Sequence, residues 1–249
     1  MGYEKLRVLD LFSGIGGFSL GLERTGGFRT VAFCEIEPYC RAVLRKHWPG
    51  IPCFEDVRSL YASDMPEPID VICGGFPCQD ISAAGEQVGI DGSRSGLWRE
   101  FARLIGETRP KFCIVENVAA LLNRGMGRVL ADLAALGYGA EWHCIPASVV
   151  DAPHERDRVW IIGYPERKHN PSQIVSAIPR KPWAEARLGE LVRISSPAFR
   201  SEALAALGGM DDGIPSGLDI DRLRSLGNAV VPQIPEIIGR AILEAEGRE

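Results

Sequence analysis

The chain has 249 residues, of which 45 % are hydrophobic and 24 % charged, a balance typical of globular proteins and not of disordered or collagen-like chains. Twenty-eight basic against 33 acidic residues give a net charge of −5, which excludes a polycation that coats nucleic acid with its whole surface. The length suits one large domain, or one domain with a small lobe. No apolar run reaches the ~18 residues of a membrane span, and the charged first segment is unlike a signal peptide.

The cysteines favour a reducing compartment. Their number, seven, is odd, and no two of them form a CxxC pair. This pattern predicts reduced, buried thiols in a cytoplasmic protein rather than a disulfide framework or a zinc site, so no metal is expected. The seven are Cys34, Cys40, Cys53, Cys73, Cys78, Cys113 and Cys144.

Short apolar runs alternate with helix-like segments along most of the chain. Strands are expected over 6–12, 29–34, 69–73, 111–115 and 159–164. Helices are expected over 16–25, 38–47, 97–107, 125–136 and 234–246. This alternation predicts an α/β fold, with a parallel sheet and helices on both faces. Ligands of such sheets bind at the carboxyl ends of the strands.

The composition changes after Tyr164, where strand periodicity is lost. We therefore expect a catalytic and cofactor-binding domain over 1–164, a small irregular lobe over 165–221 and a C-terminal segment over 222–249 that returns to the first domain. Residues 154–200 hold nine basic and five acidic residues, a net of +4, so the rest, with 19 basic and 28 acidic, has a net of −9. The stretch is either a solvated lobe with an incidental charge excess or a surface for phosphates.

A glycine-rich turn, Phe12-Ser13-Gly14-Ile15-Gly16-Gly17, follows the first expected strand. Glycines there let the backbone approach a ligand closely. The turn lacks both GxGxxG spacing and a P-loop lysine, which favours an adenosine-containing ligand without a pyrophosphate. Glu35, 21 residues after Gly14, could accept hydrogen bonds from ribose hydroxyls, and Asp56 from an adenine amino group. Either could instead be an ordinary exposed carboxylate.

A second turn, Gly74-Gly75-Phe76-Pro77-Cys78-Gln79, follows another strand. A lone cysteine is usually a small buried hydrophobe, but a stiff turn at a strand's carboxyl end is where a nucleophile is held. Glu116 ends the next strand, and Arg156 and Arg158 lie beside another. We expect thiol, carboxyl group and guanidinium groups to converge on one pocket, although the arginines could be surface charges. Residues 80–98, rich in glycine and small residues, form either a loop that closes over substrate or an ordinary surface loop.

Together these motifs resemble the DNA (cytosine-5)-methyltransferase family, in that family's order. The matching segments are DLFSGIGGFSLGLE at 10–23, GGFPCQDIS at 74–82, SRSGLW at 93–98, ENV at 116–118, ERDRVWIIG at 155–163 and RSLGNAVVP at 224–232. The resemblance covers nearly the whole chain except about 165–215. It implies a Rossmann-like methyltransferase sheet, S-adenosyl-L-methionine as methyl donor, S-adenosyl-L-homocysteine as product, and no metal.

The resemblance also implies site residues. The cofactor would be held by Phe12, Ser13, Gly14, Gly16, Gly17, Glu35, Ile36, Asp56, Val57, Pro77, Leu97, Asn228, Ala229 and Val230. Glu35 would bind the ribose, Ile36 would pack on the adenine and Asp56 would bind its amino group. The catalytic residues would be Cys78, Glu116, Arg156 and Arg158. Gln79, Ser82 and Arg94 would lie on the DNA side.

The chemistry accounts for these residue types. Cytosine C5 is a poor nucleophile until a thiolate, here that of Cys78, adds at C6. Glu116 would hold N3 and the amino group and stabilise the charge that the addition creates, which requires a carboxyl group that is protonated near neutral pH. Arg158 would contact the cytosine O2, and nearby arginines would favour the thiolate. A base inside a duplex is out of reach, so the cytosine must flip out.

The chain departs from the family where DNA sequence is read. The interval 163–224, which normally holds a recognition domain, is short; His154 and Glu155 replace more usual Gln and Lys or Arg, and Gly92 stands in the loop's "DxR" element. A minimal recognition element, a very short target site or a specificity partner would each fit. Basic and aromatic residues available to such an element are Arg180, Lys181, Trp183, Arg187 and Arg193.

The expected partners are double-stranded DNA and a cognate restriction enzyme or specificity partner, with no membrane and a monomeric chain. Two other functions stay open. An RNA (tRNA) cytosine-5 methyltransferase is disfavoured because that branch usually has PPCQ where this chain has FPCQ. A non-catalytic DNA-binding relic of the fold is disfavoured by the intact Cys78, Glu116 and Arg158. A dehydrogenase would explain neither FPCQ nor ENV.

Overall fold

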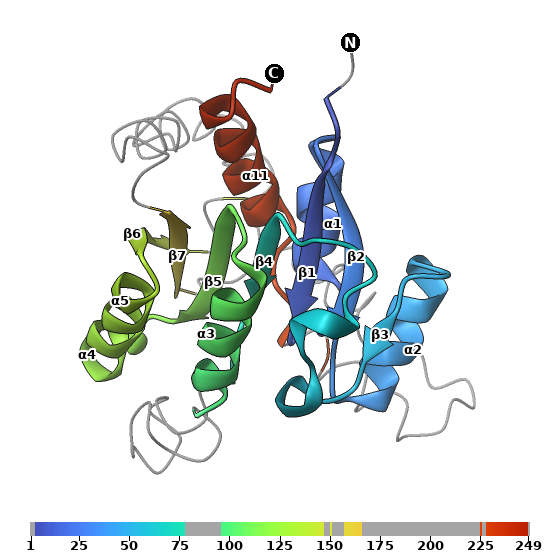
Figure 1. The fold of residues 1–249 in the computed structure, drawn as a ribbon, viewed down its shortest axis with the longest axis horizontal. Helices are drawn as coiled ribbons and strands as arrows, with labels where there is room; N and C mark the ends of the chain where they lie inside the picture. Colours follow the sequence, from blue (N-terminus) through green and yellow to red (C-terminus); the bar gives the residue numbers. More distant parts are fainter. Residues whose placement is uncertain are drawn as a thin grey trace, which may run out of the picture.

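The computed structural model describes residues 3–77, 96–146, 150, 157–165, 225 and 228–248. Within them a seven-stranded sheet has the order β3-β2-β1-β4-β5-β7-β6 (Figure 1). Neighbouring strands from β3 to β5 are parallel, whereas β7 is antiparallel to both β5 and β6. The strands are β1 (Leu6–Leu11), β2 (Phe28–Cys34), β3 (Cys53–Phe54), β4 (Val71–Gly74), β5 (Phe112–Val118), β6 (Tyr138–Pro146) and β7 (Asp157–Pro165).

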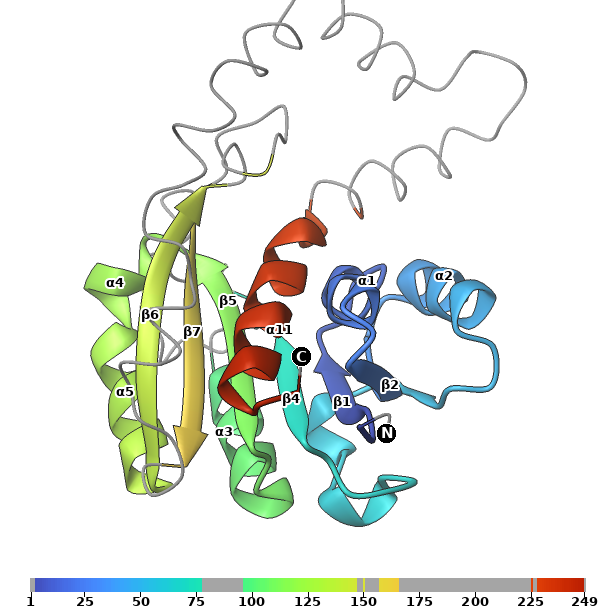
Figure 2. The ribbon, with the colours of Figure 1, turned by 90° about the horizontal axis from the view of Figure 1, so that it is seen from above.

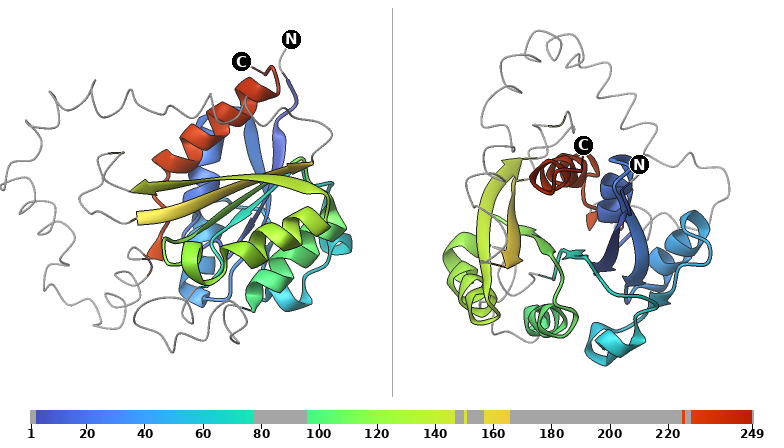
Figure 3. Two further views of the ribbon diagram at one scale, coloured as in Figure 1. Left: turned by 90° about the vertical axis from the view of Figure 1, so that its left-hand side faces the viewer. Right: turned by 45° about the horizontal axis from the view of Figure 1, so that its top comes forward.

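Helices cover both faces of the sheet (Figure 2). They are α1 (Gly17–Arg24), α2 (Pro38–His47), α3 (Leu97–Thr108), α4 (Leu121–Arg124), α5 (Met126–Ala135) and α11 (Gln233–Ala245), with short 3₁₀ turns at Val57–Ser59 and Ala62–Asp64. Figure 3 shows α3 and α5 on one side of the strands and α1 with α11 on the other. None of the helices that the structure describes is long and apolar enough to cross a bilayer.

The central strands read as continuous apolar runs because both of their faces are buried. In β1, Leu9 and Leu11 pack toward α3 and α5, whereas Leu6 and Val8 pack toward α1 and α11. The buried residues of β5 and β7 alternate between the same two clusters. Two hydrophobic cores therefore hold the sheet rigid, and its strand ends become a fixed platform for a site.

The last two strands correct the expected all-parallel sheet. The sequence predicts the strand at 159–164 but not β6, whose residues are mostly half-buried or exposed and show no clear apolar periodicity. Because β7 runs antiparallel to β5, Arg158 near its start pairs with Val118 at the end of β5. This reversed direction brings Arg158 to the carboxyl ends of the parallel strands. In a parallel arrangement a residue at the start of the strand would lie at the opposite edge of the sheet.

The C-terminal segment packs closely against α1. A Cβ atom on Gly17 would lie 2.4 Å from the Val230 carbonyl oxygen, and one on Gly21 would lie 2.1 Å from that of Pro232. Only glycine at these α1 positions allows so close an approach, which seats the segment leading into α11. The Arg248 guanidinium donates to the Glu4 carbonyl at 2.6 Å, so the two ends of the chain meet (Figure 1).

Candidate active site

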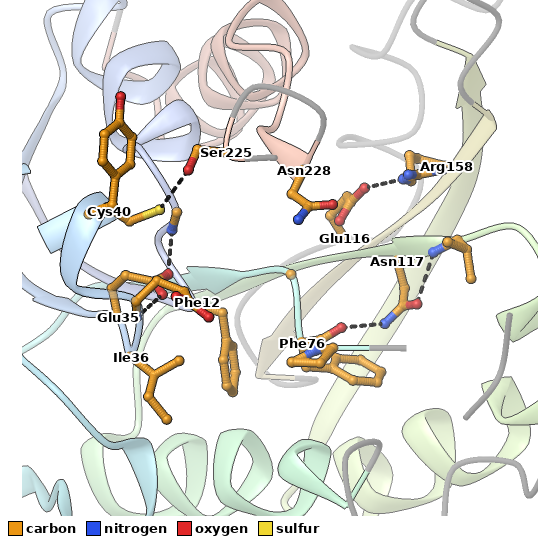
Figure 4. A pocket seen from close by; sticks show the side chains of 16 residues that line it. Phe12, Glu35, Ile36, Cys40, Phe76, Glu116, Asn117, Arg158, Ser225 and Asn228 are labelled. Atoms are coloured by element: carbon orange, nitrogen blue, oxygen red, sulfur yellow. Dashed lines mark hydrogen bonds and ion pairs between the residues drawn. The ribbon is translucent and has the colours of Figure 1, made fainter. Parts of the chain in front are cut away.

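A cavity of about 340 Å³ opens where the parallel strands end, a size suited to a small-molecule ligand. Eight of its lining residues are predicted from the sequence: Phe12, Gly14, Glu35, Ile36, Pro77, Glu116, Arg158 and Asn228. Eight others lack an individual prediction: Glu37, Tyr39, Cys40, Gly75, Phe76, Asn117, Val118 and Ser225. Figure 4 shows Glu35, Ile36 and Phe12 toward one end, Glu116 and Arg158 toward the other, and Asn228 between them.

Glu35 is fixed by the backbone at the first end. It follows β2 and is only 7 % exposed. One carboxylate oxygen accepts the Gly14 N–H at 2.7 Å, and the other accepts the Glu37 N–H at 2.8 Å. A carboxylate offers about four acceptor positions, so two remain for hydroxyl groups of a ligand. The glycine-rich turn and Glu35 thus form one rigid unit.

Phe12 and Ile36 provide apolar surface beside this unit. Phe12 has a φ of 52°, uncommon for a residue with a side chain. Its ring stacks on that of Phe101 in α3, with centroids 6.4 Å apart. Ile36 is 62 % exposed although it is large and apolar. An apolar rim next to a buried carboxylate suits a ligand with a flat ring and a polyhydroxylated sugar.

The glycines of the turn have separate structural reasons. Gly14 and Gly16 adopt positive φ values of 54° and 87°. A Cβ atom on Gly16 would lie 2.6 Å from the Trp48 ring. Gly16 therefore makes room for this ring and Gly17 for the C-terminal segment, while Gly14 alone of these three lines the cavity. Cofactor contacts by Gly16 and Gly17 stay predictions.

Other expected cofactor residues lie away from the cavity lining. They are Ser13, Asp56, Val57, Leu97, Ala229 and Val230. The Ser13 hydroxyl donates to the Asp10 carbonyl at 2.6 Å, which braces the turn from inside. Asp56 accepts from the Arg58 guanidinium at 2.6 Å and caps the turn at Val57–Ser59; the hydrogen bonds from Arg58 lower the pKa of Asp56. If Asp56 binds the adenine amino group, it must share or give up its hydrogen bond from the Arg58 guanidinium.

Glu116 and Arg158 meet at the second end of the cavity. Glu116 is 9 % exposed near the end of β5, and its carboxylate lies 2.7 Å from the Arg158 Nε. An adjacent guanidinium stabilises a carboxylate over the neutral acid. The contact of Glu116 with a base, which the sequence predicts, would therefore have to be shared with or exchanged for this ion pair.

The expected nucleophile, Cys78, lies outside the described residues. So do Arg156, Gln79, Ser82, Arg94, His154, Glu155, Gly92 and the basic residues of 166–200. Pro77, one residue before the thiol, lies at the cavity. That Cys78 and Arg156 also reach the cavity stays a prediction.

The other thiols are mostly unsuited to nucleophilic chemistry. Burial raises the pKa of Cys34 and of Cys113 to about 12, and raises that of Cys73 well above its usual value. Cys144, in contrast, is exposed and Cys53 half-buried, so the expectation that the thiols are buried is wrong for these two. Within the described ranges no group of histidines, cysteines and carboxylates could hold a metal ion.

The fold and the cavity residues together define a class of protein. A Rossmann-like α/β sheet carries a glycine-rich turn and an acidic residue at adjacent strand ends, with a buried acid, an arginine and Pro77 lining the same cavity. Comparison with known proteins then assigns the family: residues 6–202 match the model of the C-5 cytosine-specific DNA methylase family, and the chain belongs to it.

Curated relatives agree with this assignment, and solved structures share the fold. The chain is 39 % identical to the Type II methyltransferase M2.BsuMI of Bacillus subtilis (strain 168), over 63 % of this chain and 41 % of that protein. It is 32 % identical to the Type II methyltransferase M.AquIA of Picosynechococcus sp., over 67 % of this chain and 78 % of that protein. The fold resembles the S. pombe Dnmt2 methyltransferase, with a TM-score of 0.63 at 15 % identity, covering 96 % and 99 % of the two chains. The chain spans about half the length of most of the curated relatives it matches, such as 54 % of M.DsaV of Dactylococcopsis salina.

Proposed function

We propose that the chain transfers a methyl group from S-adenosyl-L-methionine to C5 of cytosine in double-stranded DNA, through a covalent bond between Cys78 and C6 of a flipped-out base. The observation that carries this proposal is the single cavity that joins Glu35 and Ile36 at one end with Glu116 and Arg158 at the other. A methyl donor and a base could then meet within it, beside the residue that precedes Cys78.

The first end fits the methyl donor. The two free acceptor positions of the Glu35 carboxylate suit the two ribose hydroxyls, and Ile36 offers an exposed apolar surface for adenine. Gly14, with open space where a side chain would stand, lets the methionine part lie against the backbone. When bound, the cofactor supplies an electrophilic methyl group on a sulfonium.

At the second end the chain's own residues would activate the base. The Cys78 thiolate forms a bond to C6, and the electrons of the C5–C6 double bond make C5 nucleophilic while charge develops at N3 and O2. Glu116 would hold N3 and the amino group, and Arg158 would hold O2, which stabilises that charge. After C5 has taken the methyl group, a base removes the C5 proton and the thiolate leaves, which restores the double bond. Arg156 would support the thiolate.

DNA recognition would fall to the region between β7 and the C-terminal segment. The relatives are named Type II methyltransferases, which supports a role in restriction and modification beside a cognate restriction enzyme. We assign the catalytic and cofactor-binding unit to 1–164, recognition to 165–221, and closure of the cofactor site to 222–249. Gln79, Ser82 and Arg94, which precede α3 in the sequence, would contact DNA.

A reconstituted reaction tests the proposal. Purified protein is incubated with S-adenosyl-L-methionine and unmethylated duplex DNA, and the nucleosides are analysed by mass spectrometry. We expect 5-methyldeoxycytidine with the wild type and none with Cys78→Ser, which should still bind the cofactor. Methyl transfer by Cys78→Ser at the wild-type rate would refute the covalent mechanism. No product from duplex DNA, together with 5-methylcytidine in a parallel reaction on transfer RNA, would refute the assignment to DNA.

A further inference from the structure

Asn117 is a buried side chain beside the reacting groups that the proposed reaction leaves without a role. It follows Glu116 directly and is 2 % exposed. Its amide nitrogen donates to the Phe76 carbonyl at 3.1 Å, and its amide oxygen accepts the Val118 N–H at 2.9 Å. The side chain therefore links the end of β5 to the segment that leaves β4 (Figure 4).

This hydrogen bond lies just beyond the point at which β4 and β5 stop pairing with each other. β4 and β5 are parallel neighbours, and the last pair in their register is Gly74 with Val115. Beyond it, residues 75–77 leave the sheet, whereas residues 116–118 stay in β5 and pair only with β7, and both segments line the same cavity. The Asn117 amide joins them across 41 positions of sequence and fixes the Phe76 carbonyl, two residues before Cys78.

Gly75 sets the position of Glu116 from the opposite side. A Cβ atom at position 75 would lie 2.7 Å from the second carboxylate oxygen of Glu116, closer than two such atoms approach in proteins. The first carboxylate oxygen is held by Arg158 at 2.7 Å, and the Glu116 side chain is only 12 % exposed. A side chain at position 75 would therefore push the Glu116 carboxylate out of its place.

We propose that Asn117 is a positioning residue that fixes the turn leading to Cys78 relative to Glu116, and that Gly75 provides the space in which the Glu116 carboxylate is held. The inference rests on the proposed function, since it concerns the spacing between the nucleophile and the acid. Displacing a reacting group by about 1 Å costs on the order of 100-fold in rate. Neither residue contacts the ribose end, so both should affect turnover rather than cofactor affinity.

The main variant is Asn117→Ala, with Tyr138→Phe as its control. The Tyr138 hydroxyl is buried and donates to the Pro110 carbonyl at 2.6 Å, at the amino end of β5. Each change removes one buried hydrogen bond to a backbone carbonyl, and Asn117→Ala also removes the bond from the Val118 N–H, but only Asn117 lies at the cavity. We expect Asn117→Ala to lower kcat by about 10- to 100-fold with the KM for S-adenosyl-L-methionine within about twofold of wild type, whereas Tyr138→Phe keeps kcat and lowers only the melting temperature.

A second variant, Gly75→Ala, removes no hydrogen bond and is expected to lower kcat in the same way. Wild-type kcat in folded Asn117→Ala, or an equal loss of kcat in Tyr138→Phe, would overturn the inference; if Asn117→Ala does not fold, Gly75→Ala with wild-type kcat would overturn it. Should the wild type itself transfer no methyl group, the proposed function fails separately. Hydrogen exchange then decides the inference: the peptide covering 71–77 should exchange faster in Asn117→Ala than in Tyr138→Phe, and equal exchange would contradict it.

Discussion

Replacing Glu35 by Gln tests the cofactor end of the cavity independently of the base end. Both carboxylate oxygens of Glu35 accept backbone N–H groups, from Gly14 at 2.7 Å and from Glu37 at 2.8 Å. A Gln amide has one oxygen and one NH₂ group, so one of these N–H groups would face another donor. Losing a hydrogen bond to a charged group costs about 1.5–3 kcal/mol, which corresponds to roughly 10- to 150-fold in an equilibrium constant.

We expect the Glu35→Gln variant to bind S-adenosyl-L-homocysteine more weakly by that factor, because the turn is no longer held and an acceptor for the ribose is lost. Isothermal titration calorimetry measures the affinity. Glu37→Gln is the matched control, because it makes the same charge change at the cavity wall but keeps the Glu37 N–H that Glu35 binds. Equal affinity of wild type and Glu35→Gln, or an equal loss in the control, would refute the assignment of the cofactor to this end.

Three further predictions concern the nucleophile, a buried acid and the DNA surface. Cys78→Ser should abolish methyl transfer but keep the calorimetric affinity for S-adenosyl-L-homocysteine within about threefold, and loss of both would point to a folding defect. Burial raises the pKa of Asp10 to about 7. The folded protein therefore keeps a proton on Asp10 that the unfolded chain loses near pH 4. The protonated Asp10 contributes to the free energy of unfolding below about pH 4, and this contribution is lost as the pH rises through about 7. The free energy of unfolding, measured with urea, should fall less between pH 5 and pH 8 in Asp10→Asn than in the wild type. The same fall in both proteins would contradict this prediction. DNA affinity should fall steeply with salt, and replacing Arg180 and Lys181 by Gln should flatten the logarithmic slope by about one unit per lost phosphate contact; an unchanged slope would remove these residues from the DNA surface.

The sequence predicts those parts of the fold whose pattern is local. Runs such as FCIVENV, buried on both faces, indicate strands, and the order of motifs predicts which strand ends meet. β6 could not be predicted because an edge strand with half-exposed residues lacks a period. The direction of β7 depends on its pairing with β5 and not on its own residues. The motif predicts Arg158 at the pocket, but only the three-dimensional structure shows that an antiparallel strand carries it there.

The site residues divide in the same way, into those that a local motif reveals and those whose roles depend on contacts between distant segments. Glu35, Ile36, Glu116 and Arg158 carry chemistry that a motif reveals, and all four line the cavity, while their roles stay predictions. Gly75 and Asn117 act through neighbours 41 positions away in the sequence, so their roles require the register of β4 and β5. The exposure of Cys144 likewise depends on its place on β6 and not on its type.

The central claim is most directly tested by bisulfite sequencing of the genome of a methylation-free bacterial host that expresses this chain, with Cys78→Ser as control. The account predicts methylated cytosines in one sequence context with the wild type and none with the control. Scattered methylation would show that the catalytic site works but reads little sequence. Complete absence of methylation in a host that makes soluble, cofactor-binding protein would contradict the assignment of this chain as a DNA cytosine-5 methyltransferase that acts alone.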